Sequence, residues 1–250
     1  MILFLHFHKC GGSTINKCFN HYIKYKPNVN GNPFLVDDEY NKKSIIKFWE
    51  YKPDKINTFF HNIIEDKIQF IACEWNWFKY SDIQHINFDK INLITCIRDP
   101  FERFISNYNA NGGNTIFQTP EKYNNKILYW ERSFTNQKFK LNTNKYNYYV
   151  KLLNGLGNKP NAKINKTHLD NAKNILCKFN TIIILEKPET FKLLQEYGIA
   201  EVVTRNKSNK PKPIITQDFK DQFIINNKYD YELYNFAANL SLSKLKKLNY

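Results

Sequence analysis

The feature that most constrains the fold is an apolar segment that runs directly into a turn with two glycines. Residues 1–8 read MILFLHFH, which is typical of a strand buried on both faces of a parallel sheet. The pattern breaks at Lys9, passes through Gly11 and Gly12, and becomes helical from Ser13. The sequence therefore predicts a buried β-strand, a tight turn and a helix in immediate succession.

This turn has the properties of an anion site. Gly11 and Gly12 allow a tight backbone and leave N–H groups with no side chain in front of them. A helix that begins at Ser13 adds the positive end of its dipole, and Lys9 adds a mobile charge. The lysine precedes both glycines, whereas in a Walker A loop it follows the last one. Taken alone, the motif fits a phosphate site and a plain strand-to-helix turn equally well.

The rest of the chain predicts an α/β fold. Further strands are expected over residues 69–73, 91–97 and 181–185. Helices are expected over residues 14–25, 146–154, 166–178, 187–197, 218–226 and 230–248. Strands that alternate with helices indicate a parallel sheet flanked by helices in three layers, with ligands bound at the carboxyl ends of the strands. A chain of 250 residues is expected to form a single domain over residues 1–250.

A second candidate anion site follows the third predicted strand. That strand ends at Arg98, and Asp99 is placed to cap a helix with Pro100 in its first turn. Ser106 lies eight residues beyond Arg98, about two helical turns into this segment. A guanidinium and a hydroxyl in this arrangement can hold a phosphate. The structural alternative is a capped helix with an ion pair between Arg98 and Glu102.

The charge of the chain favours anionic partners. It carries 37 Lys and Arg against 23 Asp and Glu, for a net charge of +14, and such a balance suits nucleotides, acidic glycans, nucleic acid or an anionic membrane surface. The chain is also rich in Lys, Asn and Ile throughout. A scattered lysine excess of this kind equally describes a solvated surface.

The cysteines and the apolar segments bear on localisation. Five widely spaced cysteines with no CxxC pair are typical of reduced thiols in the cytosol. The first apolar run is interrupted by histidines and a lysine, unlike a signal peptide, and no segment reaches transmembrane length. We therefore expect a cytoplasmic or otherwise soluble intracellular protein, with no signal peptide or membrane anchor in this chain.

Two motifs together resemble the cofactor motifs of sulfotransferases that use 3′-phosphoadenosine 5′-phosphosulfate (PAPS). They are HFHKCGGST at residues 6–14 and CIRDPFERFISNY at residues 96–108, and they look closest to the heparan-sulfate and carbohydrate O-sulfotransferase group. The resemblance implies a P-loop NTPase-like sulfotransferase fold. It departs from the family pattern at His8, where proline is usual, and at Cys10, where threonine is usual.

The resemblance also implies how the donor binds. The 5′-phosphosulfate is expected on the first motif, at Lys9, Cys10, Gly11, Gly12, Ser13 and Thr14. The 3′-phosphate is expected between Arg98 and Ser106. Arg205 lies in a segment that looks like the family's late loop over the nucleotide, and it is expected to contact the cofactor as well.

The implied reaction transfers a sulfuryl group from PAPS to an acceptor hydroxyl, expected on a carbohydrate, and releases adenosine 3′,5′-bisphosphate. Lys9 is expected to act as a catalytic cation that neutralises charge on the leaving nucleotide. Glu74, at the end of the second predicted strand, is the expected general base, with His61 and His85 as alternatives. No metal ion and no nucleic acid are expected as partners.

Two other classes of function remain open from the sequence. A P-loop-like nucleotide kinase has the same fold logic, but it needs a lysine after the glycines and a carboxylate for Mg²⁺. A non-catalytic module that binds polyanions accounts for the charge and the aromatic residues. That class leaves the motifs at Lys9 and Arg98 without an explanation.

Overall fold

The structure is a computed structural model that describes residues 1–19, 58, 61, 70–74, 91–108, 146–157, 162–202 and 217–248. Four strands form one parallel sheet in the order β2-β1-β3-β4. They are β1 (Ile2–His6), β2 (Phe70–Glu74), β3 (Asn92–Ile97) and β4 (Thr181–Ile184). Each lies within two residues of its predicted range, so the predicted α/β fold with a parallel sheet is confirmed.

The register of the sheet brings the carboxyl ends of its strands to one edge. His6, the last residue of β1, lies opposite Glu74 of β2 and opposite Cys96 of β3. Ile97 at the end of β3 lies opposite Ile184 at the end of β4. The two predicted anion motifs follow β1 and β3, which are neighbours, and therefore emerge side by side at this edge.

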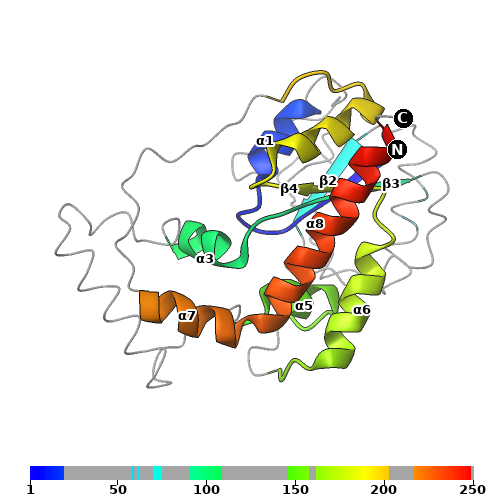
Figure 1. The fold of residues 1–250 in the computed structure, drawn as a ribbon. Helices are drawn as coiled ribbons and strands as arrows, with labels where there is room; N and C mark the ends of the chain where they lie inside the picture. The colour runs from blue at the N-terminus through cyan, green and yellow to red at the C-terminus, as the bar shows by residue number, and fades with distance from the viewer. Residues whose placement is uncertain are drawn as a thin grey trace, which may run out of the picture.

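Helices cover both faces of the sheet (Figure 1). One face carries α1 (Gly12–Cys18) and the 3₁₀ helix η7 (Pro188–Tyr197). The other carries α5 (Tyr148–Leu153), α6 (Lys166–Leu176) and the long α8 (Lys228–Leu248). The sheet between these two helical layers gives the three layers that the alternating pattern predicted.

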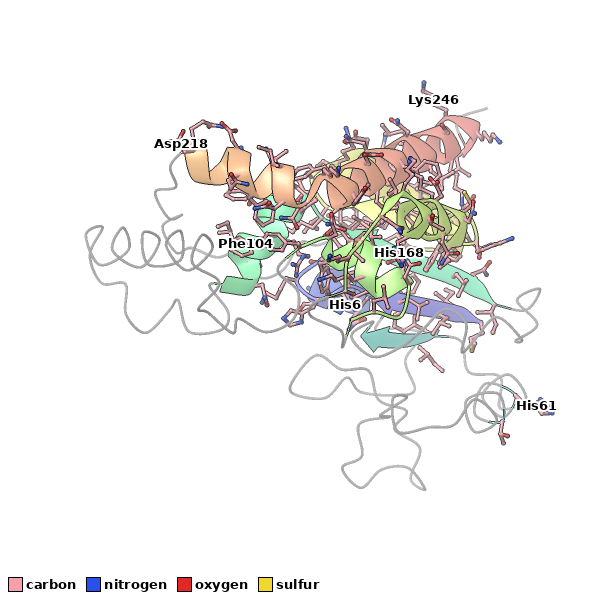
Figure 2. All side chains as sticks on the ribbon, turned by 90° about the horizontal axis from the view of Figure 1, so that it is seen from below. His6, His61, Phe104, His168, Asp218 and Lys246 are labelled. Carbon is pink, nitrogen blue, oxygen red and sulfur yellow. The ribbon has the colours of Figure 1, made fainter. Side chains whose placement is uncertain are left out.

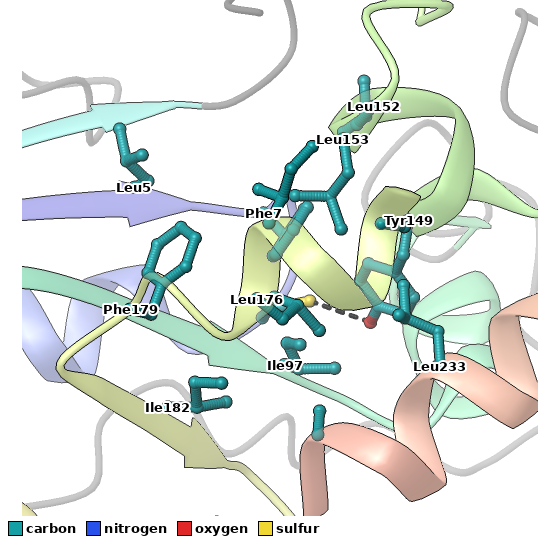
Figure 3. Close-up of a cluster of buried hydrophobic side chains, with 14 of the residues drawn as sticks. Leu5, Phe7, Ile97, Tyr149, Leu152, Leu153, Leu176, Phe179, Ile182 and Leu233 are labelled. Atoms are coloured by element: carbon teal, nitrogen blue, oxygen red, sulfur yellow. Dashed lines mark hydrogen bonds between the residues drawn. The ribbon is translucent and has the colours of Figure 1, made fainter. Parts of the chain in front are cut away.

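The side chains of β1 alternate between the two layers, as the period of a strand requires. Leu3, Leu5 and Phe7 pack with the buried residues of α5, α6 and α8, a cluster shown in Figure 3. Ile2 and Phe4 pack on the opposite face with residues of α1 and η7. Burial on both faces explains why the first segment reads as continuously apolar.

Two further helices lie at the carboxyl edge of the sheet. α3 (Pro100–Tyr108) follows β3 directly, and it packs against α7 (Gln217–Asn226) through a small cluster of Phe101, Phe104 and Phe223 (Figure 1). The Asp99 carboxylate accepts the amides of Phe101 at 2.9 Å and Glu102 at 3.0 Å. The predicted cap of this helix is therefore confirmed.

The helix predicted over 14–25 corresponds to α1, which begins at Gly12 and ends at Cys18, and residues 20–25 lie outside the described residues. The remaining predicted helices agree in position with small differences in type and length. The segment predicted over 187–197 is a 3₁₀ helix, which ends at Gly198 with φ 75°. None of the helices in the described ranges is both long and apolar enough to cross a bilayer. Cys10, Cys18, Cys96 and Cys177 are free thiols.

A buried carboxylate joins α8 to the start of α5. Asp230 is 1% exposed, and its two oxygens accept the amides of Tyr149 at 3.1 Å and Val150 at 3.0 Å. Burial raises the pKa of this carboxyl to about 6, against hydrogen bonds and the Arg103 charge, which lower it. Asp230 thus satisfies the first amides of α5, which have no partner within that helix.

The raised pKa of Asp230 predicts that the stability of the fold depends on pH. From about pH 4 to about pH 6 the folded chain holds a proton on Asp230 that the unfolded chain has released, so the contribution of this group to the free energy of unfolding falls as pH rises. Asp230→Asn lacks that contribution. Denaturant unfolding from pH 4 to 7 should show the variant gaining roughly 1 to 3 kcal/mol relative to the wild type across this window. A constant difference between the two chains contradicts the prediction.

Candidate active site

The turn after β1 leaves three amides open. Gly11 adopts φ 78°, and its carbonyl accepts the amides of Thr14 at 3.0 Å and Ile15 at 3.1 Å. In the part of the chain that the structure describes, no hydrogen bond is made by the amides of Gly11, Gly12 or Ser13. Successive N–H groups at the start of a helix form a concave donor set for an anion.

Both glycines of this turn lie close to neighbouring side chains. A Cβ at Gly12 lies 2.5 Å from two atoms of the His6 ring, which is closer than any side chain can approach. A Cβ at Gly11 lies 3.0 Å from a methyl group of Leu185, and its positive φ already disfavours a side chain. The turn therefore packs closely against the His6 ring and Leu185, which glycine allows.

Lys9 has a left-handed backbone, with φ 65°. This conformation is uncommon for residues other than glycine and costs about 1 kcal/mol or more. Only Cys10 separates Lys9 from the first of the open amides.

The side chain of Cys10 points away from the open amides and into the core. It is fully buried, and its Sγ lies 3.2 Å from the hydroxyl oxygen of Tyr149 (Figure 3). Burial raises the pKa of the thiol to about 11, so the group is protonated at neutral pH. The Cys10 amide already donates to the Phe7 carbonyl at 3.1 Å, so neither the thiol nor the amide of Cys10 joins the open donor set. Next along α1, Ser13 is exposed and Thr14 is buried.

Arg98 follows β3 and is held by two carboxylates. Its Nη2 lies 3.4 Å from Oε2 of Glu102, and its Nε lies 3.5 Å from Oε1 of Glu186. The pair with Glu102 is the one considered as the structural alternative from sequence. Both carboxylates are about one third exposed, so water weakens their ion pairs with Arg98. A phosphate group that binds Arg98 therefore has to displace only weak interactions.

Sequence reasoning missed Glu186. It follows β4, accepts the Asp99 amide at 2.9 Å through Oε2, and also accepts the Tyr234 hydroxyl at 3.2 Å. Burial raises the pKa of its carboxyl above the ordinary value. The signal was available, because residues that follow neighbouring parallel strands meet at one edge of the sheet.

Ser106 lies in α3, four residues after Glu102. Residues four apart share one face of a helix, so Ser106 lies one turn beyond the carboxylate that contacts Arg98. Its side chain is half-buried. This placement keeps Arg98 and Ser106 on the same side of α3.

The structure locates some of the candidate general bases and not others. Glu74 ends β2, opposite His6, at the edge that carries both anion motifs. His61 is exposed and lies well apart from His6 in Figure 2. His85 and the expected cofactor contact Arg205 lie outside the described residues. Within the described ranges, no group of three or more His, Cys, Asp or Glu side chains is placed to hold a metal ion.

Comparison with known proteins identifies the family. The sequence profile described as Sulfotransferase family matches residues 1–237, which is nearly the whole chain. The chain therefore belongs to the sulfotransferase family, and the reaction of that family is the transfer of a sulfuryl group. A search of curated proteins finds no match to this chain.

Proposed function

We propose that this protein transfers a sulfuryl group from PAPS to an acceptor hydroxyl on a carbohydrate. The observation that carries the proposal is the pair of anion motifs on neighbouring strands of a member of the sulfotransferase family. β1 leads into the open amides of Gly11, Gly12 and Ser13, and β3 leads into Arg98. Two separate anion sites at one edge suit a nucleotide that carries phosphate groups at both its 5′ and 3′ positions.

The residues present fit this donor. The three amides and the start of α1 would hold the 5′-phosphosulfate, since these N–H groups make no hydrogen bond within the described residues. Arg98 and Ser106 would hold the 3′-phosphate, in competition with Glu102 and Glu186. When bound, PAPS supplies the sulfuryl group together with a stable nucleotide leaving group.

Three parts of the chain then have distinct roles. The Lys9 ammonium neutralises negative charge that grows on the leaving oxygen as the bond to sulfur breaks. The amides of the turn donate to the non-bridging oxygens and hold them in place. Glu74 accepts the proton from the acceptor hydroxyl, whose oxygen attacks the sulfur in line with the leaving group.

The assignment of the 3′-phosphate predicts opposite effects for two variants. Arg98→Ala should weaken binding of adenosine 3′,5′-bisphosphate by roughly tenfold to a hundredfold, the usual worth of a charged hydrogen bond. Glu102→Gln should strengthen the same binding about twofold, because it removes a competing anion. Adenosine 5′-phosphate, which lacks the 3′ group, should bind both variants nearly as it binds the wild type. Titration calorimetry measures all six affinities, and equal changes for the two nucleotides contradict the assignment.

Labelled transfer tests the reaction itself. The protein is incubated with PAPS that is radiolabelled on sulfur and with three acceptors: a desulfated glycosaminoglycan, a tyrosine-containing peptide and a simple phenol. We expect label in the glycosaminoglycan. Label in the peptide or the phenol alone contradicts the carbohydrate acceptor, and an absence of transfer to all three contradicts the proposal as a whole.

A further inference from the structure

We infer that Tyr149 is a positioning residue that locks the two anion motifs to each other, so that a nucleotide with both phosphates meets them in a fixed relation. The inference rests on the proposed function. Its basis is one hydroxyl group in the core, which contacts the turn after β1 and the end of β3 at the same time.

The hydroxyl of Tyr149 uses its full bonding capacity at this point. It donates to the carbonyl of Arg98 at 2.6 Å and accepts the amide of the same residue at 3.2 Å. Because its single proton goes to that carbonyl, the Cys10 thiol is the group that can donate across the 3.2 Å contact between Sγ and the hydroxyl oxygen, although its one proton is shared with the His8 carbonyl at 3.6 Å. One oxygen atom therefore contacts a residue of the first motif and a residue of the second; Figure 3 shows its contact with the thiol.

The ring that carries this hydroxyl is held rigidly. Tyr149 is fully buried, with edge-to-face contacts to Phe7 at 5.0 Å and to Tyr148 at 5.3 Å between ring centroids. Its own amide donates to Asp230 of α8 at 3.1 Å. Helix α5 is thus fixed from behind, and the hydroxyl has little freedom to follow either motif if that motif moves.

The neighbouring tyrosine provides a matched comparison. The hydroxyl of Tyr148 accepts the amide of His8 at 3.0 Å, a contact with the first motif. The guanidinium of the buried Arg103 lies 3.7 Å from the centre of its ring. The two tyrosines are adjacent in α5 and almost equally buried. Among the described residues, the hydroxyl of Tyr149 contacts both motifs.

A fixed relation between the motifs matters to ligands that bind both. Such a ligand gains its second contact at little further cost only when the two sites are already correctly placed. A ligand that binds one motif gains nothing from the link. Loss of the link should therefore weaken the binding of adenosine 3′,5′-bisphosphate more than the binding of adenosine 5′-phosphate.

The experiment measures the affinities of both nucleotides by titration calorimetry for the wild type, Tyr149→Phe and Tyr148→Phe. Circular dichroism establishes a temperature at which all three are folded. We expect Tyr149→Phe to lower the ratio of the two affinities by roughly threefold to tenfold, the net worth of about one hydrogen bond. Tyr148→Phe should weaken the binding of both nucleotides alike and leave the ratio of their affinities unchanged. If Tyr149→Phe does not fold, Cys10→Ala removes the other end of the link and should lower the ratio in the same direction.

The outcomes separate this inference from the proposed function. An unchanged ratio in Tyr149→Phe, with wild-type chain that binds the bisphosphate more tightly than the monophosphate, overturns the inference alone. An equal fall in the ratio of affinities in both tyrosine variants also overturns the inference. Such a result means that either substitution loosens α5 as a whole. Wild-type protein that binds neither nucleotide overturns the proposed function and this inference together.

Discussion

Replacement of Glu74 by glutamine is expected to lower turnover by roughly a hundredfold to ten-thousandfold, the usual worth of a positioned general base. Glutamine keeps the shape and the hydrogen-bonding capacity of the side chain, but it cannot take the proton from the acceptor hydroxyl. The position of Glu74 at the end of β2, opposite His6, places it at the same edge as both anion motifs. Binding of adenosine 3′,5′-bisphosphate should be unchanged, which calorimetry can measure.

A matched control for this variant is Glu196→Gln. Glu196 is exposed near the end of η7, and the adjacent Tyr197 hydroxyl lies 2.9 Å from that of Thr181, the first residue of β4. Glu196 therefore lies toward the edge of the sheet opposite the anion motifs, and loss of its carboxylate should leave turnover unaltered. Near-normal turnover in Glu74→Gln contradicts the assignment and makes His61→Ala and His85→Ala the next variants to measure.

Loss of the Lys9 ammonium is expected to reduce turnover on the order of a hundredfold or more, with a smaller change in nucleotide affinity. The charge that the lysine balances grows toward the transition state, so its removal acts mainly on the rate. Two variants make the test sharp, Lys9→Ala and Lys9→Gly. Because glycine adopts the observed φ of 65° without strain, the glycine variant should melt no lower than the alanine variant while turnover falls alike in both.

Lys17→Ala is the control for charge. Lys17 lies in the last turn of α1, so the variant removes one positive charge from the same segment without altering the turn, and turnover should stay close to that of the wild type. If Lys9→Ala keeps its maximal rate and loses only affinity for the nucleotide, Lys9 is a binding residue and has no catalytic role.

The fold followed from the sequence because the core strands are buried on both faces. Continuous apolar runs, such as residues 1–8 and Thr181–Ile184, are typical of buried strands in a parallel sheet when helices alternate with them along the chain. The cap of α3 at Asp99 was equally readable, since Pro100 admits few other backbone conformations. The 3₁₀ character of η7 was not readable, because its apolar spacing also fits an α-helix.

The candidate site was only partly readable, for a physical reason. The open amides depend on local residues, Gly11 and Gly12, and such a turn leaves a signature in sequence. The contacts that brace it, from Tyr149 and Glu186, come from distant segments and depend on how the helices pack on the sheet. Cys10 illustrates the difference, because its place in the motif suggested a ligand contact, whereas its thiol faces the core.

The most direct test of the central claim is the thermal shift of the wild-type chain with adenosine 3′,5′-bisphosphate, compared with ATP and magnesium. At about a hundred times its dissociation constant, a ligand stabilises the folded state by about 2.7 kcal/mol. For a chain of this size that raises the melting temperature by roughly 5 to 10 °C. We expect this shift for the bisphosphate and a much smaller one for ATP with magnesium. A larger shift with ATP and magnesium, or none with the bisphosphate, contradicts it.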